Sequence, residues 1–255
     1  MTKTRGRLPV AGFSLLEMVV IIAVMGILAA AVTPALVQRV TDTRIESTRD
    51  EARTLYEAIV GNPAEGANGG LAFGYVGDMG RLPDAYTELV QKGSQANYTT
   101  STTRSIGMGW RGPYVNDGTS SGDYLTDAFG RQYTGASSGQ VKSAGLDGVA
   151  GNTDDIVYPP SAPTITGSVL VTVKTTQGQK TVVDPGGYRV DLFYSNSGAE
   201  AMVSDTTSPF SFSSIPMGIH AVRVVKTSNP GAGDIVSQDT VVVRPNSTAA
   251  IELWF

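Results

Sequence analysis

Residues 13–37 read FSLLEMVVIIAVMGILAAAVTPALV, and this stretch decides the fold class. It is 25 residues long, and its one ionisable side chain is that of Glu17. A helix rises about 1.5 Å per residue, so this one would reach roughly 37 Å and cross a bilayer core of about 30 Å. We therefore expect residues 13–37 to form a membrane-spanning helix.

The segment before this stretch, residues 1–12, carries Lys3, Arg5 and Arg7 and no acidic residue. The positive-inside rule then predicts a cytoplasmic N-terminus, with everything after residue 37 on the other side of the membrane. A secretory signal peptide would have a shorter apolar core of roughly 7–15 residues. Glu17 is a candidate functional residue because a carboxylate inside a membrane span is costly. The alternative is a plain signal anchor whose Glu17 side chain reaches the membrane interface.

The helix is expected to continue past the apolar stretch. Apolar residues recur every three or four positions up to Ile59, with charged residues largely between them. This spacing predicts one long helix over residues 13–61, lipid-facing at first and amphipathic later. Gly61, Asn62 and Pro63 are typical of a helix end, while Gly26 and Pro34 are weak points inside it.

The rest of the chain changes character near residue 160. Residues 62–158 are expected to form a globular head: residues 64–100 are mixed, with a short helix over residues 84–91, and residues 101–158 are rich in Gly, Ser, Asp and Tyr, with short strands. From residue 164 apolar side chains alternate with a period of two, as in Val169, Val171 and Val173. About seven such runs separated by turn signals predict an antiparallel β-sandwich over residues 164–255. The expected fold class is α+β.

Composition excludes several kinds of site. The chain has no cysteine and a single histidine, His220, which leaves no thiol nucleophile and no multi-histidine metal site. The formal net charge is −4 with a pI of about 5.0, so nucleic acid is not an expected partner. No nucleophile–base constellation and no glycine-rich phosphate loop is found. We therefore expect a protein that is not an enzyme.

The sequence GFSLLE at residues 12–17 joins the basic segment to the apolar helix. It resembles the class III signal of type IV prepilins and of type II secretion pseudopilins. The resemblance implies that a prepilin peptidase removes residues 1–12 as a leader, cutting after Gly12, and methylates the new N-terminus at Phe13. Glu17 becomes the fifth mature residue, at the position of the family's glutamate, where it can neutralise the Phe13 ammonium in lipid.

The same resemblance implies the protein's surroundings. Gly26 and Pro34 fall where such helices carry glycine and proline, so they are expected to give the helix flexibility. The expected partners are other pilin or pseudopilin subunits, a prepilin peptidase, an inner-membrane platform protein, a cytoplasmic assembly ATPase and, before assembly, membrane lipid. The expected location is the bacterial inner membrane in a single pass, with the globular parts in the periplasm or in an extracellular filament.

A second resemblance, to the major pseudopilins of type II secretion, covers the head. Residues 63–73 and 97–105 depart from the pattern, and major pseudopilins usually end near Tyr158, whereas this chain continues. The tracts that carry the resemblance are, in order, GDMGRLP at 77–83, TELV at 87–90, GWRGPYV at 109–115, DAFGRQY at 127–133, SAGLDG at 143–148 and DDI at 154–156.

The last two tracts resemble the calcium loop of the pseudopilins. Calcium prefers several oxygen ligands in a flexible loop, and the spacing does not fit an EF-hand. The resemblance implies Asp147 and Asp154 as ligands, with Asp155 as a substitute and the carbonyls of Ala144 and Val149 as further ligands. The alternative is a solvated Asx-Gly turn that holds no metal.

Residues 164–255 resemble transthyretin-like, or carboxypeptidase-regulatory-like, sandwiches, which are usually adhesive or interaction modules. The whole chain is thus interpreted as a structural subunit of a type II secretion pseudopilus or a related type IV pilus-like filament. One alternative is a minor or specialised pilin with an exposed adhesive or DNA-binding β module. Another is a membrane-anchored enzyme or binding protein, of which the binding protein is the stronger because no catalytic cluster is found.

Overall fold

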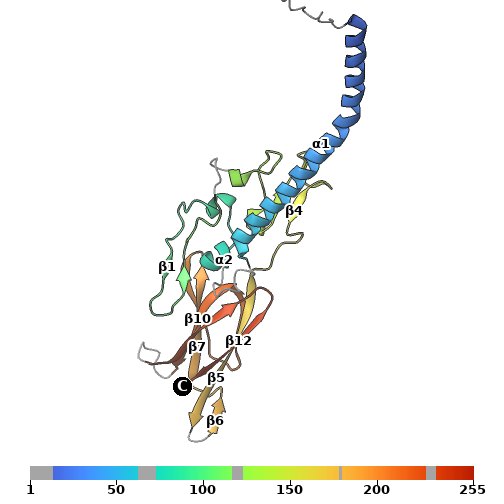
Figure 1. The fold of residues 1–255 in the computed structure, drawn as a ribbon. Coiled ribbons are helices and arrows are strands. Elements are labelled where there is room, and N and C mark those ends of the chain that lie inside the picture. Colours follow the sequence, from blue (N-terminus) through green and yellow to red (C-terminus); the bar gives the residue numbers. More distant parts are fainter. Residues whose placement is uncertain (1–13, 63–72, 117–122, 178–179, 228–233) are drawn as a thin grey trace, which may run out of the picture. The chain divides into compact units, whose positions relative to one another are not determined.

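The structure, a computed structural model, describes residues 14–62, 73–116, 123–177, 180–227 and 234–255. A long helix is followed by short helices and by antiparallel and mixed β-sheets (Figure 1), which confirms the α+β class. The chain divides into two compact units between Glu46 and Ser47.

The long helix α1 spans Leu15–Val60, within two residues of the predicted bounds. At its start the Glu17 N–H donates to the Ser14 side-chain oxygen at 3.2 Å. Ser14 followed three residues later by a glutamate is the sequence pattern of a capping box, and the Ser14 bond satisfies one of the amides that a helix start leaves unpaired. At its other end Gly61 takes a positive φ of 86° and the helix stops. Pro34 lies inside α1 without ending it.

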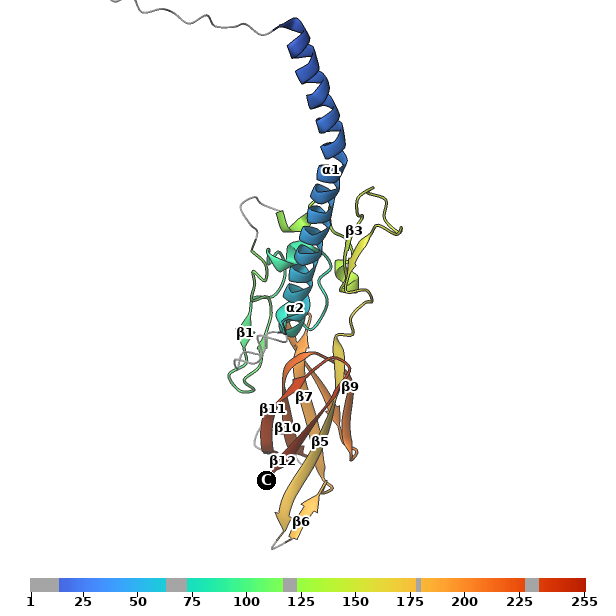
Figure 2. The same cartoon turned by 45° about the vertical axis from the view of Figure 1, so that its right-hand side comes forward.

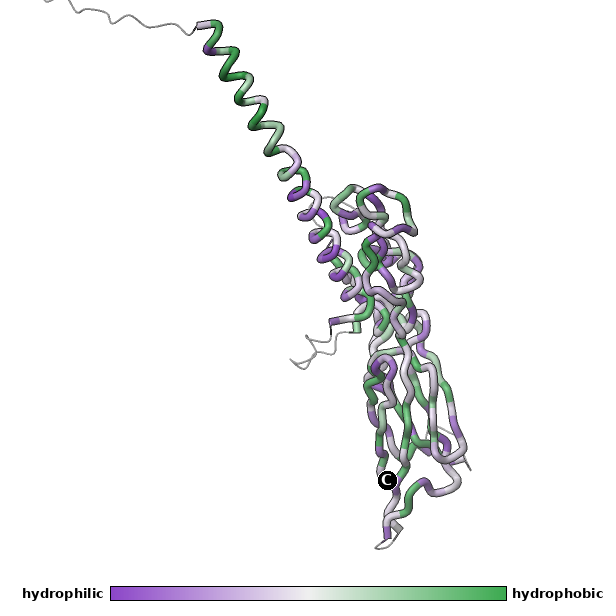
Figure 3. The backbone as a smooth tube through the Cα atoms, turned by 90° about the vertical axis from the view of Figure 1, so that its right-hand side faces the viewer, coloured by the Kyte–Doolittle hydropathy of each residue, from purple (hydrophilic) through white to green (hydrophobic). Residues whose placement is uncertain are grey.

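The first part of α1 is apolar, and its side chains are exposed. Every side chain from residue 14 to residue 40 is exposed in the single chain. Figure 3 shows the hydrophobic colour along this part of the helix and mixed colour along the remainder. The helix is long and apolar enough to span a membrane, which is consistent with a single-pass membrane anchor.

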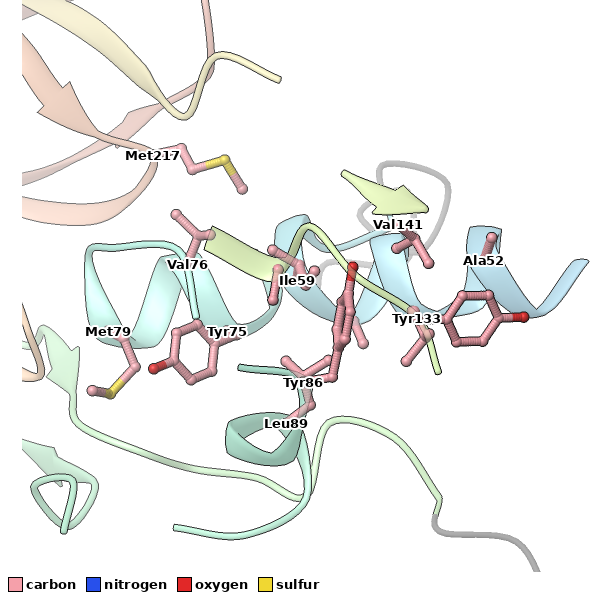
Figure 4. Close-up of a cluster of buried hydrophobic side chains, with 13 residues drawn as sticks. Ala52, Ile59, Tyr75, Val76, Met79, Tyr86, Leu89, Tyr133, Val141 and Met217 are labelled. Atoms are coloured by element: carbon pink, nitrogen blue, oxygen red, sulfur yellow. The ribbon is translucent and has the colours of Figure 1, made fainter. Parts of the chain in front are cut away.

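The second part of α1, from Ser47 onward, is amphipathic as predicted. Thr48, Ala52, Leu55 and Ile59 are buried, and their spacings of four, three and four place them on one face. This face packs into the core of the head region (residues 62–158) (Figure 4). A polar contact joins the same surfaces, because Tyr133 donates its hydroxyl to Glu51 at 2.9 Å.

The head is built from short elements around this helix face. The expected helix over residues 84–91 is a shorter 3₁₀ turn, η2, at Tyr86–Leu89, and the sequence analysis missed α2 at Gly74–Met79. The remaining elements are the β1–β2 hairpin (Thr99–Thr100 and Gly107–Met108), η3 (Asp123–Leu125), η4 (Ala136–Ser138) and the β3–β4 pair (Val141–Ser143 and Ile156–Tyr158).

Two sheets form the C-terminal β region (residues 164–255). The first has the order β11–β10–β7–β8, with strands Ile235–Val243, Gly218–Lys226, Tyr188–Asn196 and Ala199–Asp205. The second contains β12 (Thr248–Trp254), β5 (Thr166–Gln177) and β6 (Lys180–Val183), and β9 (Phe210–Pro216) also pairs with β5 (Figure 2). Ser197 and Gly198, both at positive φ, make the tight turn between β7 and β8.

Strands of both sheets bury side chains in one hydrophobic cluster, and the period-two pattern predicts them. Val169, Val171 and Val173 of β5 are buried, as are Val190 and Leu192 of β7. One pairing corrects the expectation of an entirely antiparallel arrangement, since β12 runs parallel to β5 from Ser168 to Lys174. Alternation tells which side chains face the core, but strand direction depends on the long connections between strands.

The β region also packs against the head. Ile106 and Met108 at the β2 end of the hairpin cluster with Phe193 of β7 and Ala221 of β10. Phe193 follows the core residue Leu192, so this contact covers the opposite face of the first sheet. Figure 4 shows Met217, between β9 and β10, pointing toward Val76 of α2. The boundary expected near residues 158–164 stays a prediction.

Polar contacts reinforce this junction at the hairpin tip. Arg104 binds both carboxylate oxygens of Glu200, at 2.5 and 2.7 Å, and its guanidinium lies 4.0 Å from the centre of the Phe193 ring. Gln238 of β11 donates to the Thr103 carbonyl at 2.7 Å. The stretch 97–105, which departs from the pseudopilin pattern, therefore contributes polar contacts that hold the β region to the head.

Candidate functional site

The predicted site residues of the helix lie in or beside α1. Gly12 and Phe13 fall outside the described residues. Glu17 is in the first turn of α1 and is exposed. A Cβ atom added at Gly26 would meet nothing within 4 Å, and the proline at position 34 removes one amide donor from the helix ladder.

Glu17 has a local role beside the one that the resemblance implies. It is the third residue of α1, where a carboxylate interacts favourably with the unpaired amides of the helix start. Ser14 caps the same turn. Both roles use the negative charge of Glu17, whereas the Ser14 cap does not, because Ser14 accepts from the backbone N–H of residue 17.

Two tracts of the pseudopilin resemblance meet at Asp78. One oxygen of its carboxylate accepts from the Arg111 Nε at 3.0 Å and from the Tyr114 hydroxyl at 2.9 Å. Burial raises the pKa of the Asp78 carboxyl above its usual value, although both donors oppose that shift. The Asp78 backbone carbonyl accepts from the Gly109 N–H at 3.0 Å and from the Ser195 hydroxyl of β7 at 2.7 Å.

Glu88 joins the tract at 87–90 to the same cluster. Its carboxylate accepts from Arg81 at 3.1 Å and from the Tyr75 hydroxyl, and its carbonyl accepts from the Trp110 indole at 2.6 Å. Burial and the bond to Glu88 raise the pKa of Tyr75 well above its usual value, so this hydroxyl stays protonated. These contacts bring three of the quoted tracts, 77–83, 87–90 and 109–115, together as a structural core of the head.

The five predicted calcium ligands lie in one loop, residues 144–155. Asp154 accepts from the backbone N–H groups of Leu146 and Asp147 at 2.7 and 3.0 Å. These backbone bonds, that of Asp147 first, lower the pKa of the Asp154 carboxyl. Asp147 accepts from the Val149 N–H at 2.8 Å and from the Asn152 amide at 2.7 Å. The carboxylates thus close the loop by binding its own donors.

Two of the remaining predicted ligands, Asp155 and the Ala144 carbonyl, also accept hydrogen bonds. Asp155 accepts from the Gly151 N–H at 2.6 Å, and the Ala144 carbonyl accepts from the Gly148 N–H at 3.0 Å. The Arg131 guanidinium lies 3.5 Å from the Ala144 carbonyl and donates to the carbonyls of the next two residues. Calcium needs six to eight converging oxygens, and no group of three or more metal-binding side chains converges within the described residues. Calcium binding by this loop therefore stays a prediction.

His220, the one histidine, is buried in β10. Its Nε2 lies 2.6 Å from the Pro216 carbonyl, and burial lowers its pKa to about 4. The ring is therefore neutral at pH 7 and donates a hydrogen bond to that carbonyl at the corner between β9 and β10.

Sequence reasoning missed three residues of these sites. The Ser14 cap could be found from the spacing Ser-x-x-Glu before an apolar run. Arg131 and Arg104 carry no such signal, because each meets its partners through the tertiary fold.

No protein-family model and no curated protein matches this chain.

Proposed function

We propose that this chain is a structural subunit of a type II secretion pseudopilus or of a closely related type IV pilus-like filament. A prepilin peptidase processes it between Gly12 and Phe13, and it assembles through its N-terminal helix. The observation that carries the proposal is α1 (Leu15–Val60), which begins within the GFSLLE motif at residues 12–17. Its first part exposes an apolar surface, and its second part is built into the core of the head.

Such a helix needs two successive environments. Exposed apolar side chains over more than six helical turns require lipid while the subunit is single. In a filament the same side chains pack against the helices of neighbouring subunits. The platform protein and the assembly ATPase would drive this transfer from the inner membrane, with the N-terminus cytoplasmic and the head and β region on the other side.

Glu17 takes part in the transfer under this proposal. Cleavage after Gly12 leaves a free ammonium on Phe13, and an unpaired charge in lipid is costly. A carboxylate at position 17 of the same or a neighbouring subunit neutralises it. This pairing favours the position of the incoming subunit at which the Phe13 ammonium and the Glu17 carboxylate neutralise each other.

The β region supports a second candidate within the same class, a minor or specialised pilin. The region has its own hydrophobic cluster and is clamped to the head through Arg104 and Phe193. A transthyretin-like sandwich held in this way would be presented in a fixed orientation, as an adhesive or interaction module requires. A low copy number per filament would favour this candidate over a major subunit.

Reconstituted assembly tests the proposal. We expect the chain, expressed with a prepilin peptidase, platform protein, assembly ATPase and companion subunits, to enter the high-molecular-weight fraction released by shearing. Omission of the ATPase should leave it in the membrane fraction. Gly12→Val should also leave it there, because a bulky residue blocks close approach of the backbone to the peptidase.

Immunoblotting of the sheared and membrane fractions gives the result. A chain that stays in the membrane fraction whether or not the ATPase is present would instead be a membrane-anchored binding protein.

A further inference from the structure

The Arg131 guanidinium lies in the curl of the loop at residues 144–155. Its Nη2 donates to the Leu146 carbonyl at 2.9 Å, and its Nη1 donates to the Gly145 carbonyl. A Cβ atom added at Gly148 would lie 2.7 Å from the Arg131 Cζ, so the guanidinium rests directly against the loop backbone at that glycine.

The backbone on either side of this contact is fixed by Asp127, which is buried. One oxygen of its carboxylate accepts from the Arg131 N–H at 2.9 Å, and the other accepts from the Ser143 hydroxyl at 2.5 Å. The Ser143 oxygen in turn accepts from the Gly145 N–H at 3.1 Å. The arginine and the start of the loop are therefore held by one hydrogen-bonded chain.

Carbonyl groups that converge in a turn repel one another unless a cation or several donors lie between them. A guanidinium supplies both a positive charge and several donors, since it is permanently charged and has five N–H donors in a fixed plane. A calcium ion placed beside it would face repulsion between like charges.

We propose that Arg131 takes the place of calcium in this loop, so that the loop folds and holds its shape without a metal ion. Asp147 and Asp154 then act as acceptors for loop amides. The proposal does not depend on which filament uses the chain, because it concerns a contact inside one subunit.

The test compares thermal unfolding of the full chain in detergent, followed by tryptophan fluorescence, with millimolar calcium and with excess chelator. We expect the same midpoint in both conditions. Arg131→Ala should lower the midpoint by about 3–8 °C in both, since hydrogen bonds from a charged group are lost. Arg131→Lys should recover part of that loss, because an ammonium keeps the charge without the planar fork.

Arg53→Ala is the matched control. Arg53 is 64% exposed in its side chain and pairs with Glu57 one turn away, so its loss should shift the midpoint by no more than about 2 °C. A midpoint of the unmodified chain that rises with calcium, and that no longer rises in Asp147→Ala, would overturn the proposal. An Arg131→Ala midpoint equal to that of Arg53→Ala would also overturn it.

Discussion

Glu17→Leu is expected to reduce the amount of chain recovered in sheared filaments at least about ten-fold, with insertion and folding unchanged. A lone charge within a bilayer costs about 2.5–3.5 kcal/mol on insertion scales, and each 1.4 kcal/mol is a factor of ten. Without the carboxylate the Phe13 ammonium is unpaired when the subunit leaves the membrane. The measurement is the ratio of chain in the sheared and membrane fractions.

Two further variants separate charge from helix capping. Glu17→Gln keeps a side chain that suits the third position of a capping box but removes the charge, so it should fail like the leucine variant. Ser14→Ala removes the acceptor of the Glu17 N–H, which costs about 1 kcal/mol of helix stability, and keeps the charge. It should assemble nearly normally. Normal assembly of Glu17→Gln would show that position 17 matters for the helix start and not for pairing with Phe13.

Gly80→Ala is expected to destabilise the head and the β region together, by about 3–5 kcal/mol. Gly80 ends α2 at a positive φ of 72°, and an added Cβ would lie 2.6 Å from the Ser195 carbonyl carbon. Because the contact is backbone on backbone, no side-chain rotation relieves it. Either α2 or the end of β7 must move, which breaks the bonds from Ser195 to Asp78 and from Gly198 to Met79.

Gly93→Ala is the matched control for this substitution. Gly93 also has a positive φ, 55°, but a Cβ there would meet nothing within 4 Å. It should cost only the backbone penalty of about 1–2 kcal/mol. Urea unfolding of both variants in detergent gives the comparison, and equal losses of stability would contradict a close junction at Gly80.

The parts of the fold that were predictable are those set by local periodicity. The apolar stretch and the spacing of Ala52, Leu55 and Ile59 predict α1, and alternation predicts the buried residues of the β strands. The parallel pairing of β12 with β5 was not predictable, because period-two alternation is identical in parallel and antiparallel strands. The short α2 lies in a glycine-rich stretch without a helical period.

The candidate sites were also predictable from the sequence only in part. The resemblance placed Asp147, Asp154 and Asp155 in one loop, and they do lie together. What fills that loop was not predictable, since Arg131 reaches it from thirteen or more residues away in sequence through the pairing of β3 and its neighbours. The departure of residues 97–105 from the pseudopilin pattern was visible in the sequence. Their contact with the β region was not, because Arg104 meets Phe193 and Glu200, which are about 90 or more residues away in sequence.

The central claim is that this chain is a processed, pilin-like subunit, and the mass of its mature N-terminus tests it most directly. Protein recovered from the native membrane or from sheared filaments would be measured intact and after proteolysis by mass spectrometry. The account predicts a chain that begins at Phe13 and carries one N-methyl group. A mature N-terminus at any other residue, or an intact Met1 in cells with an active prepilin peptidase, would contradict it.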